Sequence, residues 1–312
     1  MQINNVTLPL ARGLRQIGKA VRLRGWERLL RALFHPDKQK QFAFEIPFNG
    51  FVYPAVADSI IDWNALFYGA YEAFELKFLA AFAASIEDAV FMDAGANVGH
   101  HTLYMAAHAG QVHAFEPNPA MWPRIEEKIS VNGLENVVLH RCGLGSETAQ
   151  FPLFLGPESG EASLLPGASR TFLSTSVQVS IVFGDVYFPK IGIQKLDVVK
   201  MDIEGFEKHA IDGMRASLEN WRPMMMIELS ETGKEQFGNF TDFVKTFPEG
   251  YGFFCCRLKP GLSIRNGLFP LDEADYGEFT GNIFCVPVEN DNLFIELAGN
   301  AFACLAPHPA VQ

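Results

Sequence analysis

The sequence lacks a surplus of positive charge, an apolar run long enough to span a membrane, and cysteines spaced as metal ligands. Its 25 Lys and Arg residues against 36 Asp and Glu residues give a net charge of −11, which argues against nonspecific binding to nucleic acid. No apolar run approaches the length of a membrane span and no signal-peptide pattern is present, so we expect a cytoplasmic protein without a transmembrane segment. The five cysteines show no metal-ligand spacing, which predicts buried free thiols in a reducing compartment.

A strand-turn-helix pattern occupies residues 90–103, where an apolar run ends in Asp93 and a glycine-bearing turn follows. Gly95 and Gly99 are spaced Gly-x-x-x-Gly rather than Gly-x-Gly-x-x-Gly, and an acid beside the turn opposes a pyrophosphate. A zwitterionic amino acid suits this turn better, with its carboxylate on the turn amides and its ammonium near Asp93. S-adenosylmethionine carries such an end.

A second strand pattern covers residues 111–116 and ends in Glu116, 23 residues after Asp93. An acid at that place is positioned to accept both hydroxyls of a cofactor ribose. The turn that follows contains Pro117 and Asn118 and leads into another helix. Any Rossmann-like fold with acids at its strand ends remains an alternative interpretation.

Several short motifs occur in the order found in one family of enzymes. They are Asp62-Trp63, Phe67 to Glu72, Asp93 to Gly99, Phe115 to Asn118, Asn132-Gly133 with Asn136-Val137, Lys200 to Glu207, and Arg222-Pro223 with Ile227-Glu228. Over this span, about residues 62–228, the chain resembles the FkbM-type S-adenosylmethionine-dependent methyltransferases. The resemblance implies O-methyl transfer to a hydroxyl of a sugar, glycolipid, polyketide or similar small molecule or glycan.

The resemblance also implies an α/β fold. We expect a Rossmann-like, seven-stranded, mostly parallel sheet with one antiparallel strand, helices on both faces and an N-terminal helical and hairpin extension. The expected parts are a basic amphipathic helical extension (1–40), a hairpin and helix capping the site (41–85), the methyltransferase domain (86–290) and a C-terminal tail (291–312).

The cofactor-binding candidates follow from the strand ends and turns of the sequence and from the family resemblance. They are Tyr71, Glu72, Asp93, Gly95, Ala96, Asn97, Gly99, Glu116, Pro117, Asn118, Gly143 and Asp202. Tyr71 and Glu72 rest on the resemblance alone. Gly143 follows the third strand, where ligands gather in open sheets, although a simple turn explains it equally well.

A hydroxyl acceptor needs a base, because a protonated hydroxyl is a weak nucleophile. Asp202 ends the fourth sheet strand and is the first choice, with Glu204 second. His209 and Glu228 lie on the same edge, and no histidine is favoured as a catalyst. We predict no metal site, although such a carboxylate cluster is also a possible cation site. Glu207 is expected to be an acid at a helix N-terminus, where acids are favoured.

Residues 8–33 predict two short amphipathic helices with a break near Gly25. Leu10 and Ile17 fall on one face of the first, and Arg12 and Arg15 fall on the other. The favoured interpretation is a helix docked on the domain with a solvated basic face. Weak contact with a membrane surface is the alternative.

The segments that choose the acceptor carry no readable code. We place them at residues 42–85, in an irregular stretch at 151–185 and at 261–278. Within the second of these, residues 177–182 alternate like a strand, and the loop that contains Glu161 to Leu164 is expected to fold over the cofactor or acceptor. A nicotinamide-dependent oxidoreductase and a catalytically silent cofactor-binding module remain the competing functions. Oligomeric state cannot be read from this sequence.

Overall fold

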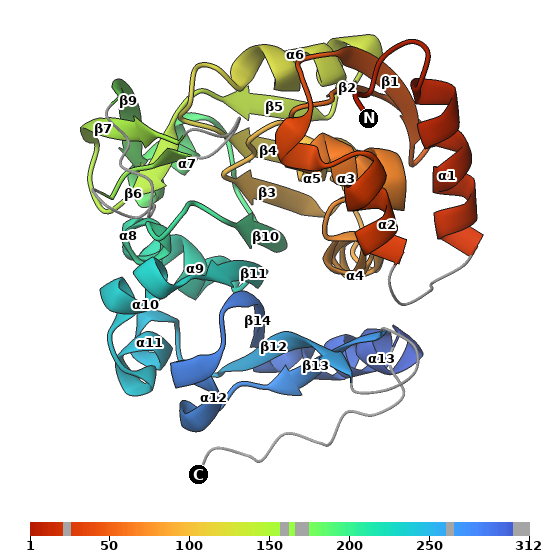
Figure 1. Ribbon diagram of the computed structural model, residues 1–312. Helices are drawn as coiled ribbons and strands as arrows, with labels where there is room; N and C mark the ends of the chain where they lie inside the picture. Colours follow the sequence, from red (N-terminus) through yellow and green to blue (C-terminus); the bar gives the residue numbers. More distant parts are fainter. Residues whose placement is uncertain (21–25, 157–161, 166–174, 260–264, 302–312) are drawn as a thin grey trace.

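The computed structural model describes residues 1–20, 26–156, 162–165, 175–259 and 265–301 (Figure 1). Its centre is an eight-stranded sheet with the strand order β13-β12-β14-β11-β10-β3-β4-β5. The strands are β3 (Val90–Ala94), β4 (Gln111–Phe115), β5 (Val137–His140), β10 (Val198–Met201), β11 (Met224–Leu229), β12 (Tyr251–Lys259), β13 (Arg265–Pro270) and β14 (Gly281–Pro287).

Five neighbouring strands, β11, β10, β3, β4 and β5, pair in parallel, and β14 is inserted antiparallel between β11 and β12. This confirms the expected methyltransferase-type sheet with its single reversed strand among seven. The count of seven needs correction, however, because β13 adds an eighth strand antiparallel to β12. Residues 265–270 gave no strand signal in isolation. Their pairing with the edge strand β12 supplies the order.

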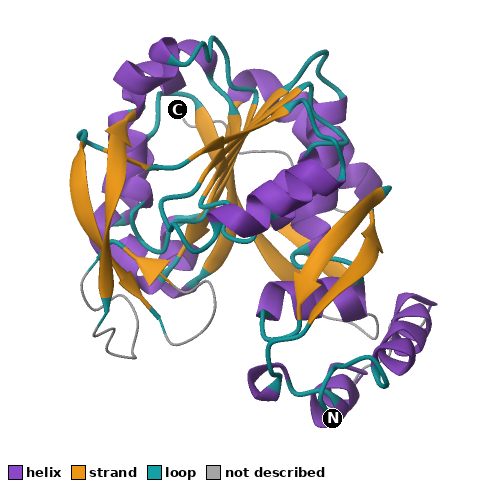
Figure 2. Ribbon diagram, turned by 90° about the horizontal axis from the view of Figure 1, so that it is seen from above, coloured by secondary structure: helices purple, strands orange, loops and turns teal. Residues whose placement is uncertain are grey.

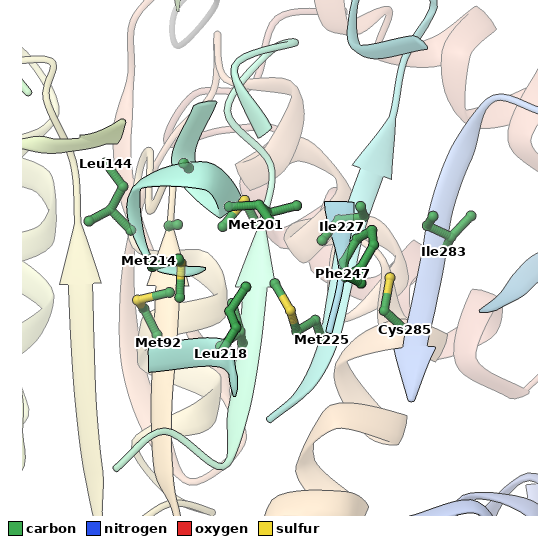
Figure 3. Packing of buried hydrophobic residues seen from close by; sticks show 14 of the residues in the cluster. Met92, Leu144, Met201, Met214, Leu218, Met225, Ile227, Phe247, Ile283 and Cys285 are labelled. Carbon is green, nitrogen blue, oxygen red and sulfur yellow. The ribbon is translucent and has the colours of Figure 1, made fainter. Parts of the chain in front are cut away.

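Helices cover both faces of the sheet. Successive side chains of a strand point to opposite faces, so neighbouring residues pack against different helices. Phe91 packs with α4 (Ala73–Ala84), α5 (His100–Met105) and α13 (Asp291–Ala301) on one face. Its neighbour Met92 packs on the other face with α7 (Gly184–Lys190), α8 (Glu207–Gly213), α9 (Arg215–Trp221) and α11 (Phe240–Thr246). Figure 3 shows Met92, Met201 and Met225 of the strands and Met214, which lies between α8 and α9, in this second core. Unbranched, flexible Met side chains fill the irregular gaps between helix and strand.

The first 70 residues form a unit with its own core (Figure 2). It contains α1 (Leu8–Ala20), α2 (Trp26–Leu33), η1 (Pro36–Lys38), β1 (Ala43–Phe48), β2 (Phe51–Val56) and α3 (Ile60–Tyr68). Asn49 and Gly50 have φ values of 48° and 86° and close the β1–β2 hairpin as predicted. Trp63 is fully buried and donates its indole N–H to the Phe34 carbonyl at 2.7 Å. The predicted break near Gly25 lies outside the described residues.

The buried carboxylate of Asp62 joins this unit to the central domain. It accepts hydrogen bonds from the Tyr53 hydroxyl at 2.7 Å and the Val56 amide at 2.6 Å. It also pairs with Arg124 on α6 (Trp122–Val131), the helix between β4 and β5. A fully buried charge requires such partners, since it is otherwise very costly.

The predicted solvated basic face of α1 is only partly what the structure shows. Arg12 is exposed and donates to the Glu45 carbonyl at 2.7 Å. Arg15 is instead buried and donates to the Pro47 carbonyl at 3.0 Å. The helix is docked as expected, and the face that it buries contains Leu8, Ala11 and Arg15.

A small second sheet in the order β6-β9-β7-β8 corrects the irregular stretch expected at 151–185, while its strand β9 confirms the strand expected at 177–182. Its strands are β6 (Gly143–Gly145), β7 (Ala149–Leu155), β8 (Ala162–Ser163) and β9 (Ser176–Phe183). Residues 157–161, with Glu161 of the expected covering segment, and residues 166–174 lie outside the described part of the chain. Val179 and Ile181 bury one face of this sheet, together with Phe206 after β10.

The remaining helices complete the C-terminal half. They are α10 (Glu231–Phe237), α12 (Glu273–Glu278) and η2 (Val288–Asn290). The segment 291–312, expected as a tail, begins with α13, whose Phe294 is fully buried, so residues 291–301 belong to the fold. Residues 302–312 and Cys304 lie outside the described residues. The other four cysteines, which the structure describes, are free thiols. No helix of the described chain has the length and apolarity to cross a membrane.

Candidate functional site

A cavity opens at the carboxyl ends of β3, β4 and β10. Ligands of open parallel sheets bind at this edge. Ile61 on α3 contributes one wall. Leu153 on β7 and Leu164, which directly follows β8, contribute another. The cavity is therefore bounded by all three parts of the fold.

Most of the predicted cofactor and catalytic residues line this cavity. They are Tyr71, Gly95, Ala96, Asn97, Glu116, Pro117, Asn118, Gly143, Asp202 and Glu204. Glu72, Asp93 and Gly99 are not among the lining residues. The sheet thus brings together residues up to 133 positions apart in sequence (Tyr71 and Glu204). Their roles in binding remain predictions.

Gly95 occupies a position that admits no side chain. Its φ is +80°, and a Cβ there would lie 1.9 Å from the carbonyl oxygen of Asp202. The ends of β3 and β10 can approach so closely only because the residue is glycine. Asn97 also has a positive φ, 52°, in the same turn.

The turn amides do not serve the role expected of them. Gly95 and Ala96 both donate to the Phe115 carbonyl, at 3.0 and 3.1 Å, and Asn97 donates to Glu116. Three N–H groups that were expected to hold a cofactor carboxylate are therefore already used to join the turn to β4. A bound carboxylate needs other donors.

Two backbone amides hold the buried carboxylate of Glu116 in place. Its Oε2 accepts from the Asn97 amide and its Oε1 from the Asn118 amide, each at 2.7 Å. Each oxygen keeps a second lone pair for a ligand. Burial raises the pKa of Glu116 to about 7, although the two amide hydrogen bonds act in the opposite direction. The group is fixed before any ligand arrives.

Lys200 is a buried cation that sequence reasoning did not single out. Its ammonium lies 3.5 Å from Asp202 and 3.6 Å from Asp93, and it donates to the Gly95 carbonyl at 3.1 Å. Burial by itself lowers the pKa of Lys200, but the carboxylates of Asp202, Asp93 and Glu72 outweigh it and raise that pKa. The period-2 position of a lysine inside an apolar strand was the available signal.

Asp93 faces away from the cavity, which corrects the expectation of a direct ammonium contact. Its side chain is fully buried, and Oδ2 accepts from the Thr102 hydroxyl at 2.6 Å. With Lys200 it forms a polar layer beneath the turn. Asp93 therefore reaches the cavity only through Lys200.

The turn after β10 is organised by Glu207, which is the first residue of α8, as the expected helix start requires, and is fully buried. Its Oε1 accepts from the amides of Ile203 at 2.9 Å and Gly205 at 3.3 Å. Burial is the main cause that raises its pKa to about 7. Glu204 has a positive φ of 58°, and its carbonyl accepts from the Ser163 hydroxyl at 2.9 Å. The acid three residues from Glu204 thus shapes the loop that carries Asp202.

Glu228 ends β11 beside Asp202. The Asp202 carboxylate, then burial, then Glu204 raise the pKa of Glu228 to about 9. Two carboxyl groups at one site share a proton because both cannot ionise cheaply. Within this pair, Glu228 is the group whose protonated form is favoured.

Two histidines at the start of α5 line the cavity, although the sequence favoured no histidine. His100 Nε2 lies 3.1 Å from the Tyr71 amide nitrogen, and its Nδ1 lies 3.2 Å from the Tyr53 hydroxyl. His101 Nε2 lies 3.2 Å from Glu72 Oε2, and Glu72 Oε1 accepts from Asn282 at 2.7 Å. These contacts fix the position of Tyr71. The pair of histidines after a Gly-x-x-x-Gly turn was the only sequence signal.

A divalent cation has no evident place in the described residues, where no group of three or more His, Cys, Asp and Glu side chains is arranged to hold one. The acids at this edge instead pair with Lys200, with each other or with backbone amides. Their arrangement suits hydrogen bonding and proton transfer.

Comparison with known proteins finds relatives that are named as methyltransferases. "Methyltransferase 1" of Beauveria bassiana is 27% identical over 195 residues, covering 56% of this chain and 76% of that protein. "Hexuronic acid methyltransferase AglP" of Haloferax volcanii is 30% identical over 134 residues, covering 43% of this chain and 53% of that protein. A solved FkbM methyltransferase from Methylobacillus flagellatus shares 14% identity over 90% of this chain and 59% of its own, with a TM-score of 0.40.

The family model described as "Methyltransferase FkbM domain" matches residues 93–255. The match begins at Asp93 within β3 and extends into β12, so it contains Glu116 and Asp202, the cavity-lining acids that directly follow β4 and β10. This confirms the resemblance that the sequence motifs predicted. The chain belongs to the FkbM methyltransferase family.

Proposed function

We propose that the protein transfers a methyl group from S-adenosylmethionine to a hydroxyl of a sugar, glycolipid, polyketide or similar acceptor. The observation that carries this proposal is the Glu116 carboxylate, fixed by two backbone amides and facing a cavity that also contains Asp202. The hexuronic acid methyltransferase named among the relatives supports a sugar derivative as acceptor. When bound, S-adenosylmethionine supplies an electrophilic methyl group.

The cavity residues fit such a donor. Glu116 offers one lone pair on each oxygen to the two ribose hydroxyls, which need paired acceptors. Gly143 and Leu144 provide a narrow apolar strand surface for the adenine. Asp202 and Tyr71 lie at the other end, near the place of the methionine portion and the acceptor. Lys200 keeps the local charge balanced beneath the site.

Asp202 is the proposed general base, and Glu204 is the second candidate. A base must lie within hydrogen-bond reach of the acceptor hydroxyl, and both acids line the cavity at the end of β10. The protonated form of the neighbouring Glu228 is favoured, so Asp202 is part of a pair that can accept one proton and redistribute it. Tyr71 limits the space in which the acceptor can lie.

Calorimetric titration with S-adenosylhomocysteine, with NAD as a parallel titrant, tests the donor. We expect micromolar binding of S-adenosylhomocysteine and none of NAD. Glu116→Gln keeps one acceptor oxygen and should weaken binding about tenfold, while Glu116→Ala should weaken it about 100-fold, in line with the cost of lost charge-assisted hydrogen bonds. Glu219→Gln, an exposed acid on α9, is the matched control. Binding of NAD instead would support an oxidoreductase.

Turnover tests the base. With a panel of sugar and phenolic hydroxyl acceptors, release of S-adenosylhomocysteine should fall about 100-fold in Asp202→Asn, a typical loss of general base catalysis. Its affinity for S-adenosylhomocysteine should stay within about threefold of wild type, a difference of less than one hydrogen bond. Full turnover in this variant would remove Asp202 as the base, and Glu204→Gln would then be measured. Cofactor binding without turnover of any acceptor would favour a silent binding module.

A further inference from the structure

Helix α1 packs against the rest of its unit with only part of its apolar side chains. Leu8 and Ala11 are buried in the contact with α3. Arg15 is also buried, and its guanidinium group donates to the Pro47 carbonyl. An amphipathic surface helix ordinarily buries its apolar stripe and exposes its charges. Here one cation is buried, and the apolar side chains of Leu10 and Ile17 are left exposed.

The outward surface is defined by Val6, Leu10 and Ile17 at the start of the chain and by Leu29 on α2. Their exposed fractions are 86%, 49%, 50% and 45%. Leu10 and Ile17 are seven residues apart, two helical turns, and so lie on one side of α1. With Met1, these four account for half of the ten exposed large hydrophobic residues in the described chain. Such concentration in one short segment indicates a contact surface.

The charge around this surface selects its partner. Residues 1–40 contain nine Lys and Arg residues and two acids, a net charge of +7, whereas the rest of the chain carries −18. Arg28, Lys38 and Lys40 are exposed in this segment. Pairing two copies of the chain through this surface would bring two strongly positive segments together, which electrostatics opposes. An anionic, apolar surface matches both properties.

We propose that the outward surface of α1 and α2 docks on an anionic lipid bilayer. Leu10, Ile17 and Leu29 enter the boundary between headgroups and acyl chains, and the flanking cations lie against lipid phosphates. The acidic remainder of the chain is repelled from the same surface, which fixes the orientation. Because α3 of this unit lines the cavity through Ile61, the docked unit is also a wall of the site.

Vesicle flotation of the full chain tests the proposal independently of catalysis. The probes are neutral phosphatidylcholine vesicles and vesicles with roughly 30% phosphatidylglycerol, a strongly anionic surface. We expect at least about tenfold more bound protein on the anionic vesicles at about 0.1 M salt and loss of binding at about 0.5 M salt. The double variant Leu10→Ser with Ile17→Ser should reduce binding about tenfold, because two apolar anchors are removed.

The matched control is Val186→Ser with Val288→Ser, two exposed valines (49% and 60%) on α7 and η2, outside this surface. It should bind anionic vesicles like wild type. Equal binding to neutral and anionic vesicles, or equal loss in both double variants, would overturn the proposal. So would a dimer, seen by light scattering, that disappears with Leu10→Ser and Ile17→Ser, because a second copy would then occupy the surface.

A charge-reversal variant covers the case in which the serine variant does not fold, as judged by circular dichroism. Arg28→Glu with Lys40→Glu changes exposed residues and leaves the α1 packing intact. It should lower binding to anionic vesicles at least about tenfold, because each reversal exchanges attraction for repulsion. Unchanged binding of this variant would contradict the electrostatic part of the proposal.

Discussion

The ammonium of Lys200 lies 3.5 Å from the Asp202 carboxylate, and its other side faces Asp93 at 3.6 Å. One buried lysine therefore couples the candidate base, at the cavity wall, to an acid that never reaches the cavity. The Lys200 side chain is 4% exposed and that of Asp93 is fully buried. Their charges are held in place by each other and by Thr102 and the Gly95 carbonyl.

Removal of the lysine should destabilise the fold. Lys200→Met leaves the buried Asp93 carboxylate without its cation, a change that costs about 3–5 kcal/mol in comparable buried pairs. The free energy of unfolding from urea titration measures this loss. Lys195→Met is the control, since its ion pair with Asp197 is largely exposed (3.0 Å, lysine side chain 44% exposed) and should cost less than about 1 kcal/mol. Similar losses in the two variants would contradict the proposed electrostatic role.

Gly95→Ala should disrupt the site more than backbone strain alone explains. Its Cβ would lie 1.9 Å from the Asp202 carbonyl oxygen. Gly50 also has a positive φ, +86°, but a Cβ there meets nothing within 4 Å. Gly50→Ala should therefore cost about 1–2 kcal/mol of stability from the left-handed conformation alone. Gly95→Ala should cost clearly more in thermal unfolding and should abolish S-adenosylhomocysteine binding.

Glu207 gives the fold a pH dependence with a definite sign. Its pKa rises from the ordinary 4.5 to about 7, mainly through burial. The folded state then holds a proton that the unfolded state releases, so stability is present below about pH 4.5 and is lost as pH rises through about 7. Glu207→Gln keeps an oxygen for the amides of Ile203 and Gly205 and cannot ionise.

The comparison of unfolding midpoints at pH 5 and pH 8 measures this effect, the two values lying on either side of the titration. The stability of Glu207→Gln relative to wild type should improve from the lower pH to the higher one. Glu207→Ala should be destabilised at both, because two buried amides lose their acceptor. A constant difference between Glu207→Gln and wild type would show that Glu207 does not titrate in this range.

Sequence periodicity located the parts of the site that depend on strand ends. The runs ending at Ala94, Phe115 and Met201 are largely apolar, which is typical of parallel strands buried on both faces. Their ends place Glu116 and Asp202 at one cavity. The direction of a side chain relative to that cavity was not available from the pattern. Asp93 lies inside a strand, and its pleat position turns it toward Thr102 and Lys200.

Long-range pairing determined what the sequence could not provide. Strand β13 exists because β12 offers it an unpaired edge, and β9, expected as a strand at 177–182, has its partner β7 in a segment whose composition predicts a loop. The burial of Arg15 depends on a hairpin carbonyl more than 30 residues away. Such contacts bring together groups that no local window contains. The amphipathic pattern of α1 was recognised correctly, but Arg15 was expected on the solvated face and Leu10 and Ile17 on the opposite one, and the structure shows the reverse for these three residues.

A substitution of Lys128 can separate the stability cost of a buried charge from the contribution of packing. Its side chain is 2% exposed, its ammonium lies 4.4 Å from the centroid of the Tyr53 ring, and no hydrogen-bond partner for it is found among the described residues. Burial lowers its pKa from 10.5 to about 8. The folded state thus disfavours the charged form, and wild-type stability rises as pH increases from about 8 to 10.5.

Lys128→Met should therefore be more stable than wild type at pH 7 by about 1 kcal/mol, as an apolar group of similar length replaces a buried cation. The advantage should shrink as pH rises toward 10.5, where the wild-type amine is neutral in both folded and unfolded states. Lys208→Met, at a half-exposed pair with Asp212, is the control and should show no such trend. A destabilised Lys128→Met at pH 7 would mean that the ring contact and the nearby Asp62 charge outweigh the cost of burial, because those two interactions alone favour the cation at this position.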